Sequence, residues 1–150
     1  DRTPGVMRQA PRSTDAPLLD RPSVRFVVGA GTAKALLALG LLALVPWLGY
    51  STAAARAVTF HFMAIGQLVL TYPARHTTAH PLPNRYLLAA VAGGTLLQVL
   101  AALWPWTSHL LGGVALPPAL WLLVVAAAGT SWALAEGVSR LVWRQERSRR

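Results

Sequence analysis

The sequence predicts an all-α membrane protein with four transmembrane helices and both termini in the cytoplasm. Three observations lead there: an apolar composition, four long apolar stretches and a one-sided distribution of arginine. Of the 150 residues, 54% are hydrophobic and only 13% are charged, whereas a typical soluble domain carries about 25% charge. A soluble bundle is excluded because helices that are apolar all round would aggregate in water.

The four apolar stretches have the length of a membrane span. A hydrocarbon core of about 30 Å is crossed by roughly 20 residues of α-helix. We place the spans at about residues 29–50, 57–73, 86–106 and 114–135. We expect no signal peptide, because the first residues are polar, contain several prolines and lack an apolar core. The predicted organisation is a cytoplasmic connector at 1–23, a four-helix domain at 24–143 and a basic tail at 144–150.

The basic residues determine the orientation. The formal charge of +9 would suit a nucleic-acid binder, but the basic residues lie in segments separated by apolar spans, so we expect no nucleic-acid partner. With four spans, one side carries Arg56 alone. The other side carries Arg2, Arg8, Arg12, Arg21, Arg25, Arg75, Arg85, Arg140, Arg144, Arg147, Arg149 and Arg150. Since cytoplasmic segments retain Lys and Arg, both termini are predicted to be cytoplasmic. Lys34, near the cytoplasmic end of its span, is interpreted as an anchor that snorkels to the interface.

Two glutamines lie within the spans. Gln67 is predicted close to the middle of the bilayer, where a carboxamide must face protein or a hydrated cavity. It could be an oxygen ligand on a cation path, because hard cations accept amide carbonyls. It could also form an interhelical hydrogen bond worth about 0.6 kcal/mol. The spacing of Gln67 alone favours this hydrogen bond over the role of cation ligand. Gln98 is interpreted as a structural polar residue of this second kind.

The remaining polar residues indicate no metal centre. His76 and His80 have a helical ligand spacing but lie in a proline-containing segment without a third ligand, so no zinc site is expected. His61 and His109 lie toward the outer side and are interpreted as solvated or interfacial.

A charged pair lies at the cytoplasmic end of the last span. Glu136 and Arg140 are four residues apart, in the order that stabilises a helix by a few tenths of a kcal/mol. We interpret them as structural polar residues.

Pairs of small residues four apart could form flat patches where helices approach closely. They could equally arise by chance in spans this rich in alanine. The pairs are Gly29 and Ala33, Ala89 and Gly93, Ala90 and Gly94, and Ala126 and Thr130.

The sequence contains no set of catalytic residues. There is no phosphate-binding glycine loop, no nucleophile triad and no pair of carboxylates in an apolar stretch. We therefore expect that the chain by itself binds no nucleotide and catalyses no reaction. The lack of an intramembrane carboxylate also argues against a compact proton-coupled exporter.

Short motifs occur in a fixed order along the chain. They are Met7-Arg8, Pro11-Arg12, Pro17-Leu18-Leu19, Ala55-Arg56-Ala57-Val58-Thr59-Phe60, Gln67-Leu68, Asn84-Arg85-Tyr86-Leu87-Leu88, Gln98, Leu116-Pro117, Leu120-Trp121 and Glu136 with Arg140. This ordered series resembles the C-terminal transmembrane domain of type II, calcium-pump-like P-type cation-transporting ATPases. The resemblance covers residues 7–144 and implies the seventh to tenth helices of a ten-helix pump.

The resemblance implies a role in ATP-driven cation transport, in which other parts of the pump bind ATP and Mg²⁺. The family's phosphorylated Asp-Lys-Thr-Gly-Thr motif is not in these residues, so we expect the chain to be a fragment. Gln67 falls where some calcium pumps place a glutamate ligand and others a glutamine. With a neutral amide there, a divalent cation, Ca²⁺ or another, would depend on carboxylates in the missing helices.

The implied partners are the lipid bilayer and the missing transmembrane helices and cytoplasmic domains of the same pump. The implied location is multi-pass in a bacterial inner membrane. The alternative is a free-standing four-span subunit or scaffold protein.

Overall fold

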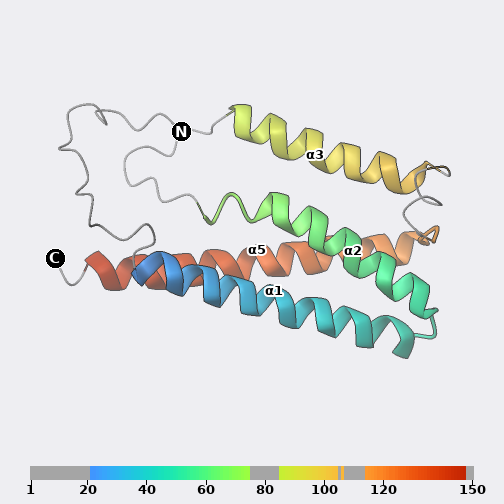
Figure 1. Ribbon diagram of the computed structural model, residues 1–150, viewed down its shortest axis with the longest axis horizontal. Helices are drawn as coiled ribbons and strands as arrows, with labels where there is room; N and C mark the ends of the chain where they lie inside the picture. The colour runs from blue at the N-terminus through green and yellow to red at the C-terminus, as the bar shows by residue number, and fades with distance from the viewer. Residues whose placement is uncertain (1–20, 75–84, 105, 107–113, 148–150) are drawn as a thin grey trace.

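The computed structural model describes residues 21–74, 85–104, 106 and 114–147. These residues form four helices and no strand: α1 (Arg21–Trp47), α2 (Thr52–Val69), α3 (Arg85–Leu103) and α5 (Pro118–Arg147). Successive helices run in opposite directions (Figure 1). One end of the bundle therefore holds the starts of α1 and α3 and the ends of α2 and α5.

Three of these helices, α1, α3 and the part of α5 from Pro118 to Arg144, are long and apolar enough to cross a membrane. The shorter α2 is not among them, and its 18 residues include Arg56, His61 and Gln67. A fourth span at 57–73 and the cytoplasmic placement of the termini stay predictions.

The helices differ in extent from the predicted spans. α1 begins at Arg21, inside the segment expected to be a connector, and α5 continues to Arg147, inside the segment expected to be a tail. Pro22 is compatible with this start because a proline in the first turn removes no helical hydrogen bond. The rest of the connector, from 1 to 20, and the end of the tail, from 148 to 150, lie outside the described residues.

The turn between α1 and α2 explains their antiparallel arrangement. Gly49 has a φ of 87°, a conformation that side chains disfavour. Its N–H donates to the Pro46 carbonyl at 2.9 Å, and the Tyr50 N–H donates to the Val45 carbonyl at 3.2 Å, which is the Schellman pattern of a helix end. Ser51 then caps α2, because its hydroxyl oxygen accepts the Ala54 N–H at 3.1 Å.

The core lies between α1, α2 and α5. A larger cluster joins Leu41 and Val45 to Phe62 and to Val124 of α5. A smaller cluster joins Phe26 and Ala30 of α1 to Ala135 of α5. α3 packs against α2 but not against α1 or α5, and Val91 is its one buried residue. α3 is therefore the peripheral helix of the described bundle.

Small residues mark two of the close approaches. A Cβ added to Gly29 would lie 3.0 Å from a methyl carbon of Val138 on α5, and one added to Gly94 would lie 3.1 Å from a methyl carbon of Leu68 on α2. The predicted patch at Ala126 and Thr130 of α5 instead remains exposed. Glycine thus sets the separation at two helix pairs, but not every small-residue pair lies in a contact.

Candidate functional site

The ammonium of Lys34 bonds α1 to α2. Its Nζ donates to the side-chain oxygen Oε1 of Gln67 at 2.8 Å and to the backbone carbonyl of Met63 at 3.1 Å. Only 5% of Lys34 is exposed. The stem packs beside Gly66, where an added Cβ would lie 3.5 Å from the lysine Cε, an ordinary van der Waals distance. The prediction that Lys34 snorkels to the interface is therefore wrong: it reaches sideways to the neighbouring helix.

Gln67 lies in the last turn of α2, which ends at Val69, whereas the sequence placed it well inside a span at 57–73. The residue is exposed in the described bundle, although its oxygen accepts the Lys34 hydrogen bond. A metal ion bound to the same oxygen would lie close to an ammonium, and the two positive charges would repel each other. The role of Gln67 as a cation ligand stays a prediction.

A second polar contact joins three helices through His61 of α2. The Nε2 of Gln98 on α3 lies 3.2 Å from His61 Nδ1. The imidazole stacks on Trp121 of α5 with ring centroids 5.0 Å apart and an interplanar angle of 29°. Gln98 thus makes an interhelical hydrogen bond. His61 is 8% exposed, so the prediction of a solvated histidine is wrong, and a position near the membrane interface stays a prediction.

The positions of Lys34 and His61 in the helical repeat could have revealed their burial. Lys34 follows Phe26 and Ala30 at intervals of four along α1, and both are buried. His61 follows the buried Ala54 and Ala57 of α2 at helical spacing. A residue that continues a buried stripe faces the bundle whatever its polarity.

The other predicted polar residues lie apart from these contacts. Arg140 Nε is 2.9 Å from Glu136 Oε1 on the surface of α5, as expected for residues four apart on a helix. Nearby, the Ser139 hydroxyl donates to the Pro73 carbonyl at 3.1 Å, which ties α5 to the turn after α2.

In the described part of the chain, no three His, Cys, Asp or Glu residues lie close enough together to hold a metal ion. His76, His80 and His109 lie outside that part.

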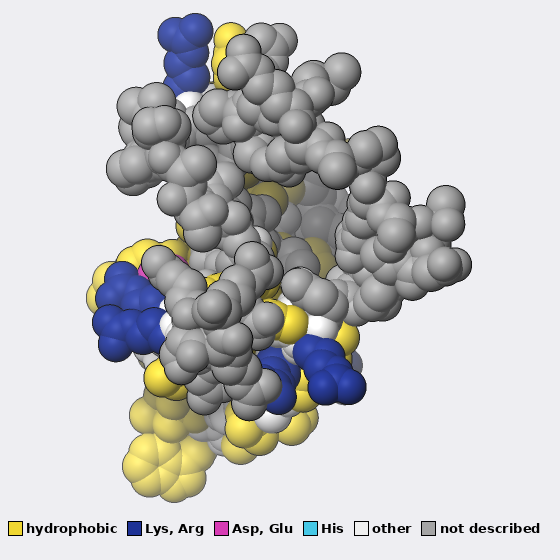
Figure 2. Space-filling model, turned by 90° about the vertical axis from the view of Figure 1, so that its left-hand side faces the viewer, with side chains coloured by type: hydrophobic (Ala, Val, Ile, Leu, Met, Phe, Trp, Pro, Cys, Tyr) yellow, Lys and Arg dark blue, Asp and Glu magenta, His cyan; other side chains and the backbone are white. Residues whose placement is uncertain are grey.

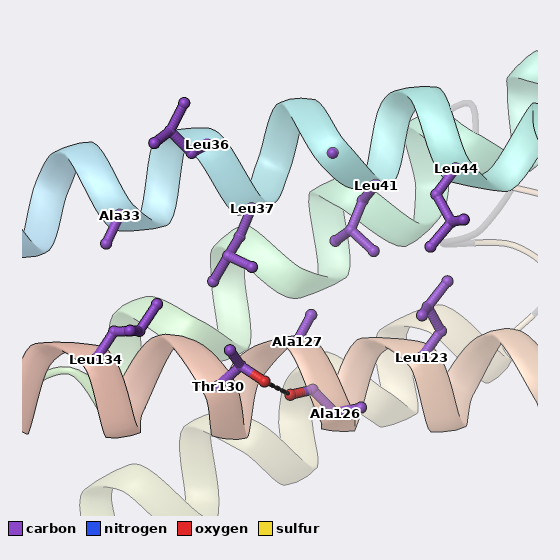
Figure 3. Close-up of a pocket in the computed structure, with 11 residues that line it drawn as sticks. Ala33, Leu36, Leu37, Leu41, Leu44, Leu123, Ala126, Ala127, Thr130 and Leu134 are labelled. Carbon is purple, nitrogen blue, oxygen red and sulfur yellow. Dashed lines mark hydrogen bonds between the residues drawn. The ribbon is translucent and has the colours of Figure 1, made fainter.

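An apolar groove of about 540 Å³ runs between α1 and α5 (Figure 3). Leu41 and Leu44 face it from α1, and Leu123 and Ala127 face it from α5. The one polar side chain that lines it, Thr130, donates its hydroxyl hydrogen to the Ala126 carbonyl of its own helix at 2.9 Å. The groove is therefore suited to an apolar occupant.

Residues 1–141 match the family described as cation transporting ATPase, C-terminus. Neither a curated protein sequence nor a solved structure gives a match. Together with the three apolar helices, the match makes the chain an integral, multi-pass membrane domain. The chain belongs to the family of C-terminal membrane domains of cation-transporting P-type ATPases.

Proposed function

We propose that the chain is the membrane-support domain formed by the seventh to tenth helices of a type II, calcium-pump-like P-type ATPase in a bacterial inner membrane. The observation that carries this proposal is the family match over residues 1–141. The proposed organisation keeps the connector at 1–23, the membrane domain at 24–143 and the basic tail at 144–150.

The arginines support an orientation with both termini in the cytoplasm. α1 starts with Arg21 and α3 starts with Arg85, while Arg140 and Arg144 lie near the end of α5. The antiparallel arrangement brings all of these to one end, which is viewed in Figure 2. Arg56, in α2, lies toward the opposite end. Since Lys and Arg are retained in the cytoplasm, the arginine-rich end faces it.

The contacts of α2 support its role as the fourth span. Its polar side chains would oppose insertion if they met lipid directly. His61 is instead covered by Gln98 and Trp121, and Gln67 bonds to Lys34. Arg56 lies close to the start of the helix, where its long side chain can reach the interface.

The exposed apolar surface supports two partners, the bilayer and the rest of the pump. Large hydrophobic side chains point outward on each of the three apolar helices, such as Leu36 on α1, Leu97 on α3 and Leu122 on α5, which are 65%, 68% and 71% exposed. In this proposal the preceding helices cover part of this surface and lipid covers the rest. ATP and Mg²⁺ act in the cytoplasmic domains of the pump, and the cargo is Ca²⁺ or another cation.

The proposal is tested in the full-length pump, purified into lipid and supplied with MgATP. We expect hydrolysis to be stimulated by Ca²⁺ or by another cation in a panel. Gln67→Leu should weaken the stimulation while expression stays normal, because the change removes the polar group that borders the proposed path.

Gln98→Leu is the matched control, since it makes the same chemical change at a glutamine bonded to His61. It should leave the cation dependence as in the wild type. If hydrolysis by Gln67→Leu depends on the cation as in the wild type, Gln67 contributes only to helix packing. A wild-type pump with no cation-stimulated hydrolysis would refute the proposed function itself.

A further inference from the structure

The ammonium of Lys34 has only neutral partners in the described structure. An ammonium has three N–H donors; two are directed at the Gln67 amide oxygen and the Met63 carbonyl. Both acceptors are uncharged, so the positive charge is hydrogen-bonded but not neutralised. A charge buried among apolar helices is costly unless an opposite charge is close.

No acidic side chain in the described part of the chain supplies that charge. Glu136 is the one acidic side chain that is described, and it binds Arg140 on the surface of α5. The remaining four, which lie in the polar end segments, are Asp1, Asp15, Asp20 and Glu146. Lys34 lies about 20 Å along α1 from the helix start at Arg21, at a rise of about 1.5 Å per residue. Among the described residues no carboxylate bonds to the ammonium, and a helix that precedes this chain in the proposed pump could supply one.

The neighbourhood of Lys34 is open to such a partner on one side. Gln67 is exposed in the described bundle and bonds directly to the ammonium. Its amide nitrogen carries two further N–H donors beside the third donor of Lys34. Two neighbouring donor groups match the two oxygens of a carboxylate.

We infer that Lys34, positioned by Gln67 and Met63, pairs with a carboxylate from a preceding transmembrane helix of the pump. The lysine is then a tethered cation: the acidic group that it neutralises is no longer offered to a transported ion. Gln67 contributes by holding the ammonium rather than by coordinating the cargo. This inference rests on the proposed function, which supplies the preceding helices.

The first test is charge balance in the full-length pump. Lys34→Met should lower cation-stimulated hydrolysis at least about tenfold, because it leaves the partner carboxylate buried and unpaired. Replacing one intramembrane Asp or Glu of the preceding helices by Asn or Gln, in the same Lys34→Met background, should restore the rate to within about threefold. Arg56→Met is the matched control, because it removes a positive charge from an exposed position, and it should retain the wild-type rate.

Rescue by replacement of one particular carboxylate, and of no other, would support the ion pair. The same holds if Lys34→Met alone fails to fold and the second replacement restores a folded, active pump. The absence of any rescue would overturn it, as would a Lys34→Met pump as active as Arg56→Met. If the Lys34 side chain were a neutral amine, it would need no charged partner, and Lys34→Met would be as active as Arg56→Met.

The second test does not depend on activity. An apolar carbodiimide joins an amine to an adjacent carboxylate, so treatment of the wild-type pump in its membrane should yield a cross-linked peptide pair containing Lys34. Mass spectrometry should assign the other peptide to a transmembrane helix of the same pump. A Lys34 peptide with no such cross-link, or one joined to a lipid, would overturn the inference. The absence of cation-stimulated hydrolysis in the untreated wild-type pump would instead count against the proposed function.

Discussion

Two polar contacts mark where α2 is held to its neighbours by more than apolar packing. Lys34 bonds to α2 at Gln67, and His61 bonds to α3 at Gln98. Because lipid offers no alternative partner to these groups, each contact defines which helix faces meet. The two contacts lie at different heights along α2, so they fix its rotation relative to α1 and α3.

The contact between His61 and Gln98 links α2 to α3 through polar groups, and a double-mutant cycle can measure its strength. We expect His61→Phe and Gln98→Leu to couple by about 0.6 kcal/mol, and by no more than about 1.7 kcal/mol, the range for hydrogen bonds between membrane helices. Thermal unfolding of the full-length protein in detergent measures the free energies. Phenylalanine keeps the stacking surface toward Trp121, so the cycle isolates the hydrogen bond. Strictly additive effects would show that the contact contributes nothing.

The sequence indicates that Gln98 needs a partner but not which partner it has. The same limit explains the errors at Lys34 and His61. A lysine stem is long enough to reach either the interface or a neighbouring helix, and here it finds the Gln67 and Met63 oxygens on α2. Such information lies in the packing of two helices and not in the pattern of one.

At the scale of the elements, hydropathy predicted the helices well because apolar length is a strong signal. α3 (Arg85–Leu103) lies close to the predicted span at 86–106. The ends are less predictable: α1 and α5 extend into polar sequence. Polarity marks where a membrane ends, whereas caps and prolines mark where a helix ends. At the end of α1 the Gly49 turn, and not polarity, stops the helix.

The contact between α1 and α5 at Gly29 predicts a position-specific effect of side-chain size. Gly29→Leu should lower the free energy of unfolding by about 1–3 kcal/mol, because its side chain would press on Val138. Gly31→Leu is the matched control on the same helix, since no atom lies within 4 Å of a Cβ added there. Thermal unfolding midpoints of the full-length protein compare the two. Equal midpoints would mean that α1 and α5 do not approach at Gly29.

The described part of the molecule has a large exposed apolar surface. The core involves α1, α2 and α5, while α3 buries a single residue. The apolar groove between α1 and α5 and the exposed leucines leave much surface for lipid and for other helices. Membership of the cation-transporting ATPase C-terminus family supplies a physical reason: in the proposed pump, the preceding helices pack on this surface.

The proposal of four spans depends most on α2, because the other three helices already have the length and hydropathy of a span. The chain has no cysteine, so single cysteines can report the side of each turn. Tyr50, before α2, and Ala74, after it, are both exposed.

The most direct measurement is therefore labelling of Tyr50→Cys and Ala74→Cys in intact cells with a membrane-impermeant maleimide. If α2 crosses the membrane with the arginine-rich end inside, Tyr50→Cys is labelled from outside, and Ala74→Cys is labelled only after permeabilisation. Labelling of both positions from the same side would show that α2 does not cross, and would contradict the four-span domain.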